Sequence, residues 1–168
     1  MTRKVKYLAQ GAVIAALYAT LTHLQNFLLP GSASWAIQFR ASEALGVLAF
    51  FTPAAIPGLA IGCLVYNISA AGVLPLDFLV GTLATLLAAW GMYLAKNIKV
   101  KNYPLLGMLF PAIANAFLVG WELSVYIGGA FWVNATYVAL GEVSVMLTLG
   151  SALYYSVKKR GLDKTVFR

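Results

Sequence analysis

The stretch AIQFRASEALGVLAFF, residues 36–51, decides how many times the chain crosses a membrane. It places Gln38, Arg40, Ser42 and Glu43 between two strongly apolar segments. As an α-helix, residues 41–51 cover only about 16 Å, roughly half the hydrocarbon thickness of a bilayer. Length alone therefore predicts a broken or re-entrant segment, and the rest of the sequence decides whether it crosses.

The composition indicates an integral membrane protein. Of the 168 residues, 61% are hydrophobic and 10% are charged, against about 45–50% and about 25% in soluble domains. Proline, glycine and charged residues separate six candidate spans: 5–29, 41–51, 54–73, 76–95, 103–128 and 130–157. No internal repeat or long linker divides them. The prediction is an all-α integral membrane protein with a single transmembrane domain, residues 1–168.

The basic residues predict the orientation. Eleven of the twelve form three clusters at the ends of spans: Arg3, Lys4 and Lys6; Lys96, Lys99 and Lys101; and Lys158, Lys159, Arg160, Lys164 and Arg168. The positive-inside rule favours the cytoplasm for all three clusters, which requires an even number of crossings between them. Residues 41–51 must then cross. Six transmembrane helices with both termini cytoplasmic follow, and the N-terminal segment is predicted to be an uncleaved first helix.

Several function classes are disfavoured. The net charge of +7 lies at the ends of spans, where anionic lipid head groups are the expected neighbours, so no nucleic-acid partner is expected. Cys63 lies in an apolar run and is predicted to be a small buried side chain. His23 has no metal-ligand spacing, no phosphate-binding loop is present, and no nucleophile has a spaced His and acid. We expect no metal, no cofactor and no catalytic residue.

Acidic residues lie inside the predicted spans or at their outer ends. Glu43 and Asp77 begin two spans from the outside, whereas Glu122 and Glu142 lie about 9 Å and about 18 Å from the outer ends of theirs. A carboxylate near the bilayer centre costs about 2.5–3.5 kcal/mol on insertion scales. We expect these acids to form a ligand site in the outer half of the membrane. The alternative is that such groups only join helices by hydrogen bonds.

Helical spacing extends this candidate site. Two predicted helices carry polar faces: Pro111, Asn115, Glu122 and Tyr126 on one, and Asn134, Tyr137, Gly141 and Glu142 on the other. The candidate substrate-binding residues are Gln38, Arg40, Glu43, Asn67, Asp77, Asn115, Glu122, Tyr137 and Glu142.

Small residues predict two close-packing faces. Gly58 and Gly62 are expected to pack inside the domain, because small side chains let helix backbones approach closely. The first helix carries Ala12, Ala15, Ala16 and Ala19. For these alanines, internal packing and contact with a partner's helix remain equally open.

Four motifs, IQFRASEALGVLAFF, VGTLATLLAAW, NAFLVGWEL and ALGEV, resemble the QueT family of queuosine-precursor transporters. Members of that family are substrate-binding S components of energy-coupling factor (ECF) transporters. The resemblance runs from the first helix to Glu142 and is most specific in QFRASEAL. It implies a six-helix S component in the plasma membrane of a prokaryote.

The resemblance also implies a substrate and partners. The substrate would be a 7-deazaguanine, such as 7-aminomethyl-7-deazaguanine or queuine, captured from outside. The partners would be a transmembrane T subunit, docked on the first-helix alanines, and two ATPase subunits. The segment 30–40 would gate the site.

The chemistry of that ligand suits the acids. A guanine-like edge offers N1–H and an exocyclic amine, and one carboxylate of Glu122 or Glu142 can accept both. Asp77 or Glu43 would hold a cationic aminomethyl group. Aromatic side chains can stack on the ring: Trp35, Trp121, Trp132 and Tyr137.

The polar residues in the stretch 36–51 have two interpretations. In the first, Arg40 and Glu43 form a local surface pair and Ser42 caps the second helix. In the second, which we favour, Arg40 neutralises a buried acid and Gln38 with Glu43 forms the outer wall of the pocket.

The rival functions are weaker. A self-sufficient transporter acting as an oligomer is the main alternative, although the paired repeats of secondary transporters are not visible. A channel would need a polar lining along its full length, and the inner halves of these spans are apolar. An enzyme is the least favoured.

Overall fold

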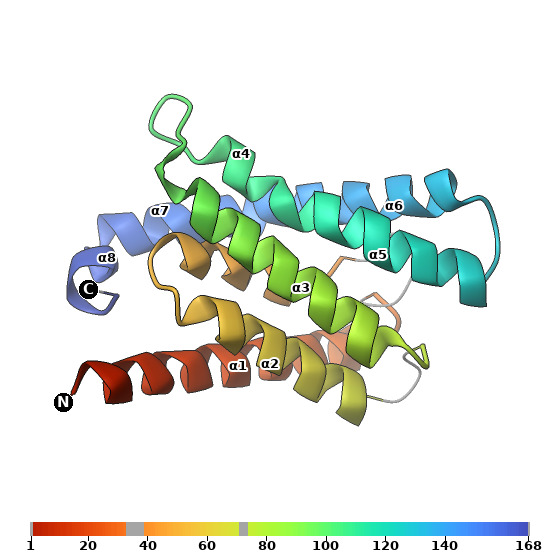
Figure 1. Cartoon of the computed structure of the whole chain (residues 1–168), viewed down its shortest axis with the longest axis horizontal. Coiled ribbons are helices and arrows are strands. Elements are labelled where there is room, and N and C mark those ends of the chain that lie inside the picture. The colour runs from red at the N-terminus through yellow and green to blue at the C-terminus, as the bar shows by residue number, and fades with distance from the viewer. Residues whose placement is uncertain (1, 33–38, 71–73, 168) are drawn as a thin grey trace.

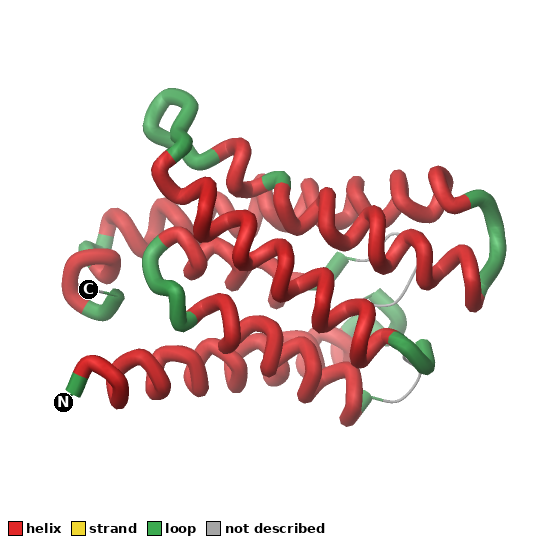
Figure 2. The backbone as a smooth tube through the Cα atoms, in the orientation of Figure 1, coloured by secondary structure: helices red, strands yellow, loops and turns green. Residues whose placement is uncertain are grey.

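The computed structural model describes residues 2–32, 39–70 and 74–167, which form an all-helical bundle (Figures 1 and 2). In chain order the elements are α1 (Arg3–Leu28), η1 (Ala41–Phe50), α2 (Ala55–Ser69), α3 (Asp77–Leu94), η2 (Ala95–Asn97), α4 (Leu105–Met108), α5 (Phe110–Tyr126), α6 (Phe131–Val145), η3 (Met146–Gly150), α7 (Ser151–Lys159) and α8 (Leu162–Thr165). Both η1 and η2 are 3-10 helices, whereas η3 is a π-helical segment.

Four apolar helical stretches are long enough to cross a membrane within the described ranges. They are Arg3–Leu28, Asp77–Asn97, Leu105–Tyr126 and Phe131–Lys159. Two shorter apolar helices, Ala41–Phe50 and Ala55–Ser69, lie between the first two of these. The all-helical membrane class predicted from the sequence is confirmed.

Local sequence explains where the helices begin and end. The Thr2 hydroxyl accepts a hydrogen bond from the Val5 amide and caps α1. A turn at Leu109 separates α4 from α5, and Pro111 lies in the first turn of α5, where a missing amide proton is tolerated. The third predicted span extends too far, because Ala70 takes an extended conformation and ends α2 at Ser69.

The polar and apolar residues 41–50 form η1, the centre of the bundle. As a 3-10 helix of ten residues, η1 rises about 2.0 Å per residue and extends about 20 Å, longer than an α-helix of the same length. Every residue from 42 to 49 is buried. Packed around η1 are α1, α2, α3, α6, α7 and the π-helical η3. Because protein surrounds it, η1 does not have to match the hydrocarbon thickness itself.

The longer helices pack in sequence around this centre, α1 on α2, α2 on α3, α3 on α5 and α5 on α6. Gly58 and Gly62 bring α2 against α1. A Cβ atom at either glycine would lie 2.7 Å from a carbonyl oxygen of α1, that of Gly11 or Ala15. The internal packing role predicted for these glycines is confirmed.

The two ends of the bundle differ. The start of α1, the C-terminal helix α8 and the turn between α3 and α4 lie at one end, whereas the α5–α6 turn lies at the other (Figure 1). The larger apolar core contains the buried residues Tyr18, Cys63, Met92, Met146 and Tyr154. Cys63 is therefore a buried apolar side chain, as predicted.

The outer surface is apolar, as a lipid-facing surface requires. Exposed side chains include Leu8 (68%), Phe27 (81%), Ile68 (68%) and Trp132 (69%). Large exposed apolar surfaces mark membrane or protein contact. Eleven polar or charged side chains of the described residues, in contrast, are buried inside the bundle.

Candidate functional site

Arg40 forms a buried ion pair with Asp77. The guanidinium Nη2 lies 3.2 Å from Asp77 Oδ2, and the two side chains are 5% and 8% exposed. Arg40 immediately precedes η1, whereas Asp77 opens α3, where the partial positive charge of a helix N-terminus favours a carboxylate. The guanidinium carbon also lies 5.8 Å from the centre of the Tyr66 ring. This pair joins the start of the central helix to the start of α3.

Asn67 supports the same junction from α2. Its amide Nδ2 donates to the Asp77 backbone carbonyl at 2.8 Å. Gly81, one turn along α3, leaves the space: a Cβ there would lie 2.8 Å from Asp77 Oδ1 and 2.9 Å from Asn67 Nδ2. Asp77 Oδ1 and Asn67 Oδ1 are buried and have no hydrogen-bond partner among the described residues. Two acceptor atoms are thus left open beside the ion pair.

Glu43 is held by α1. The Tyr18 hydroxyl donates to Glu43 Oε1 inside the bundle. One turn further along α1, Thr22 Oγ1 lies 2.7 Å from Ser42 Oγ. In the described part of the chain, no side chain caps η1. The first interpretation of residues 40–43, a local surface pair with a Ser42 cap, is therefore wrong.

Gln25 fastens both ends of the α1–η1 connection. Its Oε1 accepts from the Ala41 amide at 2.8 Å, while its Nε2 donates to the Phe39 carbonyl and to Ser32 Oγ. One side chain near the end of α1 thereby holds residues from both sides of the undescribed segment 33–38. Gln38 and Trp35 fall within that segment, outside the described residues.

Glu122 of α5 and Glu142 of α6 are buried carboxylates with open acceptor atoms. Glu122 is 0% exposed and Glu142 is 3% exposed. Both oxygens of Glu122, and Oε2 of Glu142, have no hydrogen-bond partner in the described ranges. Leaving a buried polar group unpaired costs about 1–3 kcal/mol, and more for a charged group. The ligand-free protein therefore holds unused hydrogen-bond acceptors at two positions.

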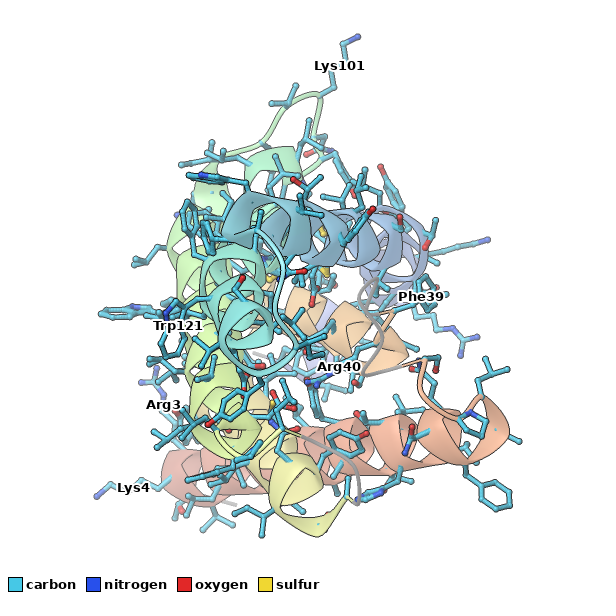
Figure 3. The ribbon with its side chains drawn as sticks, turned by 90° about the vertical axis from the view of Figure 1, so that its right-hand side faces the viewer. Arg3, Lys4, Phe39, Arg40, Lys101 and Trp121 are labelled. Atoms are coloured by element: carbon cyan, nitrogen blue, oxygen red, sulfur yellow. The ribbon has the colours of Figure 1, made fainter. Side chains whose placement is uncertain are left out.

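Arg40 is the one buried cation near these acids in the described chain. Glu122 lies within electrostatic range of Asp77 and Arg40, and Glu142 within that of Glu43 and Arg40. Among the described residues, the buried charged side chains are Arg40 and the four carboxylates of Glu43, Asp77, Glu122 and Glu142. Viewed from the end opposite the termini, Arg40 lies in the interior of the bundle (Figure 3). The site has more negative than positive groups and suits a cationic ligand with several N–H donors.

The family model described as QueT transporter matches residues 8–159. The chain belongs to the QueT transporter family. Comparisons with curated proteins and with solved structures give no match. Family membership and the apolar helices together identify a multi-pass membrane transporter.

Other residues predicted for this QueT family member's site are more exposed or form local contacts. Tyr137 is 41% exposed. It precedes Glu142 by five residues, which turns it about 140° away around the helix. Asn115 is buried, but its amide donates to the Pro111 carbonyl at 3.1 Å. Trp121 and Trp132 are 48% and 69% exposed, and Trp121 points outward from the bundle (Figure 3). The structure gathers Arg40, Glu43, Asn67, Asp77, Glu122 and Glu142.

Four polar residues of the site were missed from the sequence: Tyr18, Thr22, Gln25 and Tyr66. A signal was present for two of them, because Ile14, Tyr18 and Thr22 recur every four residues and are the buried positions of α1. The basic residues and alanines of this helix are more conspicuous than that stripe.

The alanines of α1 divide between two faces. Ala12 and Ala16 are exposed, whereas Ala15 and Ala19 are partly buried. The Ala15 backbone lies against Gly62 of α2. In this QueT family member, the surface open to a partner therefore includes Ala12 and Ala16.

Proposed function

We propose that the chain is the substrate-binding S component of an ECF-type uptake transporter and captures a queuosine precursor, a 7-deazaguanine. Membership of the QueT transporter family supports the class of substrate. The observation that carries the proposal is Glu122, a buried carboxylate whose two oxygens have no partner among the described residues. Such a group is stabilised by a ligand that brings its own donors.

The ligand offers the donors that these acids lack. The guanine-like edge of a 7-deazaguanine presents N1–H and an exocyclic amine side by side, and one carboxylate accepts both. Asp77 and Glu43 are already engaged by Arg40 and Tyr18. We therefore assign the edge and the cationic aminomethyl group to Glu122 and Glu142, one to each, in place of the role first expected for Asp77 or Glu43.

The proposed orientation places both termini in the cytoplasm and the ligand entrance outside. The three basic clusters favour this direction, and both termini lie at the same end as the turn carrying Lys101 (Figure 1). The membrane would then be crossed by α1, η1, α2, α3, α4–α5 and α6–α7. Asp77 begins α3 at the opposite end, so ligand would enter there from outside the plasma membrane.

The proposed partners are a transmembrane T subunit and two ATPase subunits. The exposed Ala12 and Ala16 support docking of the T subunit on α1, because small side chains let a neighbouring helix approach closely. The chain itself would supply recognition, and the ATPases would supply the energy.

Calorimetric titration of the detergent-purified chain tests this function. The panel contains 7-aminomethyl-7-deazaguanine, 7-cyano-7-deazaguanine, guanine and adenine. We expect the aminomethyl compound to bind best, and the cyano compound, which has the same ring without the ammonium, to bind about tenfold or more weakly, the scale of one charged hydrogen bond. Equal binding of adenine and the deazaguanines would contradict the proposal.

A further inference from the structure

A polar cavity lies at the end of the bundle that holds both termini. Its volume is about 280 Å³. Segments far apart in the sequence line it: Phe50, Phe51, Lys96, Asn97, Lys99, Tyr154, Lys158 and Asp163. The folded chain thus brings together lysines from the end of the α3–η2 segment and from the last turn of α7.

The lysines of this cavity lack acidic partners. In the described chain, no ion pair is formed by Lys96, Lys99 or Lys158. Lys96 Nζ lies 3.8 Å from the centre of the Tyr93 ring, and Lys158 Nζ lies 5.3 Å from that of Tyr154. Aromatic faces hold an ammonium in place but leave its N–H donors available. An anion with several acceptor oxygens would satisfy them.

Asp163 narrows the chemistry of that anion. It lines the same cavity, and its buried Oδ1 has no hydrogen-bond partner in the described ranges. A hydroxyl carried by the ligand beside its negative group can donate to this carboxylate. The charge of the cavity remains positive overall, with three ammonium groups against one carboxylate. A phosphodiester attached to a polyol meets both demands.

The surroundings favour a lipid as the source of that group. The lysines lie at the ends of apolar helices, and neighbouring Leu94, Ile98 and Tyr155 are 67%, 52% and 57% exposed. Basic pockets between helices at a membrane surface bind anionic head groups. We infer that this cavity binds the head group of an anionic phospholipid carrying free hydroxyls, with its phosphate on Lys96, Lys99 and Lys158 and a hydroxyl on Asp163.

Native mass spectrometry of the delipidated full chain in detergent tests this site. Phosphatidylglycerol, phosphatidylcholine and inorganic phosphate form separate arms. We expect saturable binding of phosphatidylglycerol, and a loss of affinity of about tenfold to thirtyfold in Lys96→Gln/Lys158→Gln. The control Lys101→Gln/Lys164→Gln removes the same charge from exposed positions outside the cavity and should change affinity less than about threefold.

Two results would overturn the inference. Equal losses in both double variants would mean that overall charge, not the cavity, attracts the lipid. Inorganic phosphate binding as tightly as phosphatidylglycerol, with the same dependence on the lysines, would mean a soluble anion. Lys96→Arg/Lys158→Arg should retain binding and reports on folding. If the Gln double variant does not fold, Lys99→Gln at an exposed position should still lower the affinity for phosphatidylglycerol about fivefold. Unchanged affinity in Lys99→Gln would refute the site.

Discussion

Arg40 and Glu122 are both charged side chains inside an apolar bundle, but only one has its partner within the described chain. Arg40 is paired with Asp77 at 3.2 Å, whereas both Glu122 oxygens lack a hydrogen bond to any described residue. A paired charge maintains the fold, and an unpaired one destabilises it. This contrast separates a structural pair from a group arranged for ligand binding.

The first prediction concerns stability without ligand. Glu122→Gln is expected to leave the melting temperature of the ligand-free protein unchanged or higher. The substitution replaces an unpaired ionisable group by a neutral amide of almost the same shape. Asp77→Asn is the comparison and should lower the free energy of unfolding by about 3–5 kcal/mol, since it leaves Arg40 buried without that partner. Thermal melting in detergent measures both. A Glu122→Gln variant that melts as early as Asp77→Asn would mean that Glu122 is structural.

A double-mutant cycle tests the ion pair itself. Arg40→Gln and Asp77→Asn should each be destabilising, while the double variant should fall short of their sum by at least about 1 kcal/mol, because removing both charges leaves neither unpaired. Unfolding of the four proteins in denaturant gives the coupling energy. Strictly additive losses would show that the two side chains do not act as a unit.

At the scale of elements, α1 presents one packed face and one exposed face. Gly62 of α2 packs on one face, where an added Cβ would lie 2.7 Å from the Ala15 carbonyl and from Tyr18 Cβ. Ala12 and Ala16 lie on exposed positions. Larger side chains on the exposed face should therefore affect uptake, whereas larger side chains on the packed face should affect stability.

Ala12→Trp/Ala16→Trp is predicted to fold and to bind the deazapurine normally, while uptake in cells containing the whole transporter falls at least about fivefold, because a bulky side chain obstructs a tight contact. Gly62→Leu is the matched internal variant and should instead lower the melting temperature. Affinity, melting temperature and uptake are measured for both. Normal uptake in the alanine double variant would contradict docking on this face.

Hydropathy was sufficient to predict where the helices lie, but not their winding. The predicted segment 41–51 corresponds to η1, Ala41–Phe50, because the flanking polar and proline residues mark its ends. Its 3-10 conformation depends on burial among the surrounding helices, which no local pattern encodes. The break at Leu109 has a local signal in Pro111, which lies in the first turn of α5. The π-helical Met146–Gly150 lies inside a segment that reads as continuous.

At the scale of the whole molecule, the two ends of the bundle differ in the segments that they carry. The termini and the turn carrying Lys101 share one end (Figure 1), whereas the α5–α6 turn lies at the other. The burial of Arg40 and the four acids could be predicted, because ionisable groups in apolar spans must be enclosed. Their pairing could not, since Arg40 and Asp77 are 37 residues apart. Tyr137 stays a prediction, although it lies about 140° around the helix from Glu142.

The proposed topology predicts which end a membrane-impermeant thiol reagent reaches. The native Cys63 is buried at 0% exposure and should remain unlabelled. Ala130→Cys, in the α5–α6 turn, should be labelled in intact cells, whereas Lys164→Cys of α8 should be labelled only after lysis. Both positions are exposed in the structure. The reverse labelling pattern would show that the chain has the opposite orientation in the membrane.

Affinity for 7-aminomethyl-7-deazaguanine, measured by calorimetry on Glu122→Gln and Glu142→Gln, tests the central claim most directly. Each substitution replaces a buried carboxylate acceptor, so each should cost about 1.5–3 kcal/mol of binding free energy, roughly a tenfold to 150-fold loss. Asp163→Asn, which changes an acid at the opposite end of the bundle, should bind the ligand like the unmodified protein. Unchanged affinity in both glutamate variants would contradict the account and remove these carboxylates from the site.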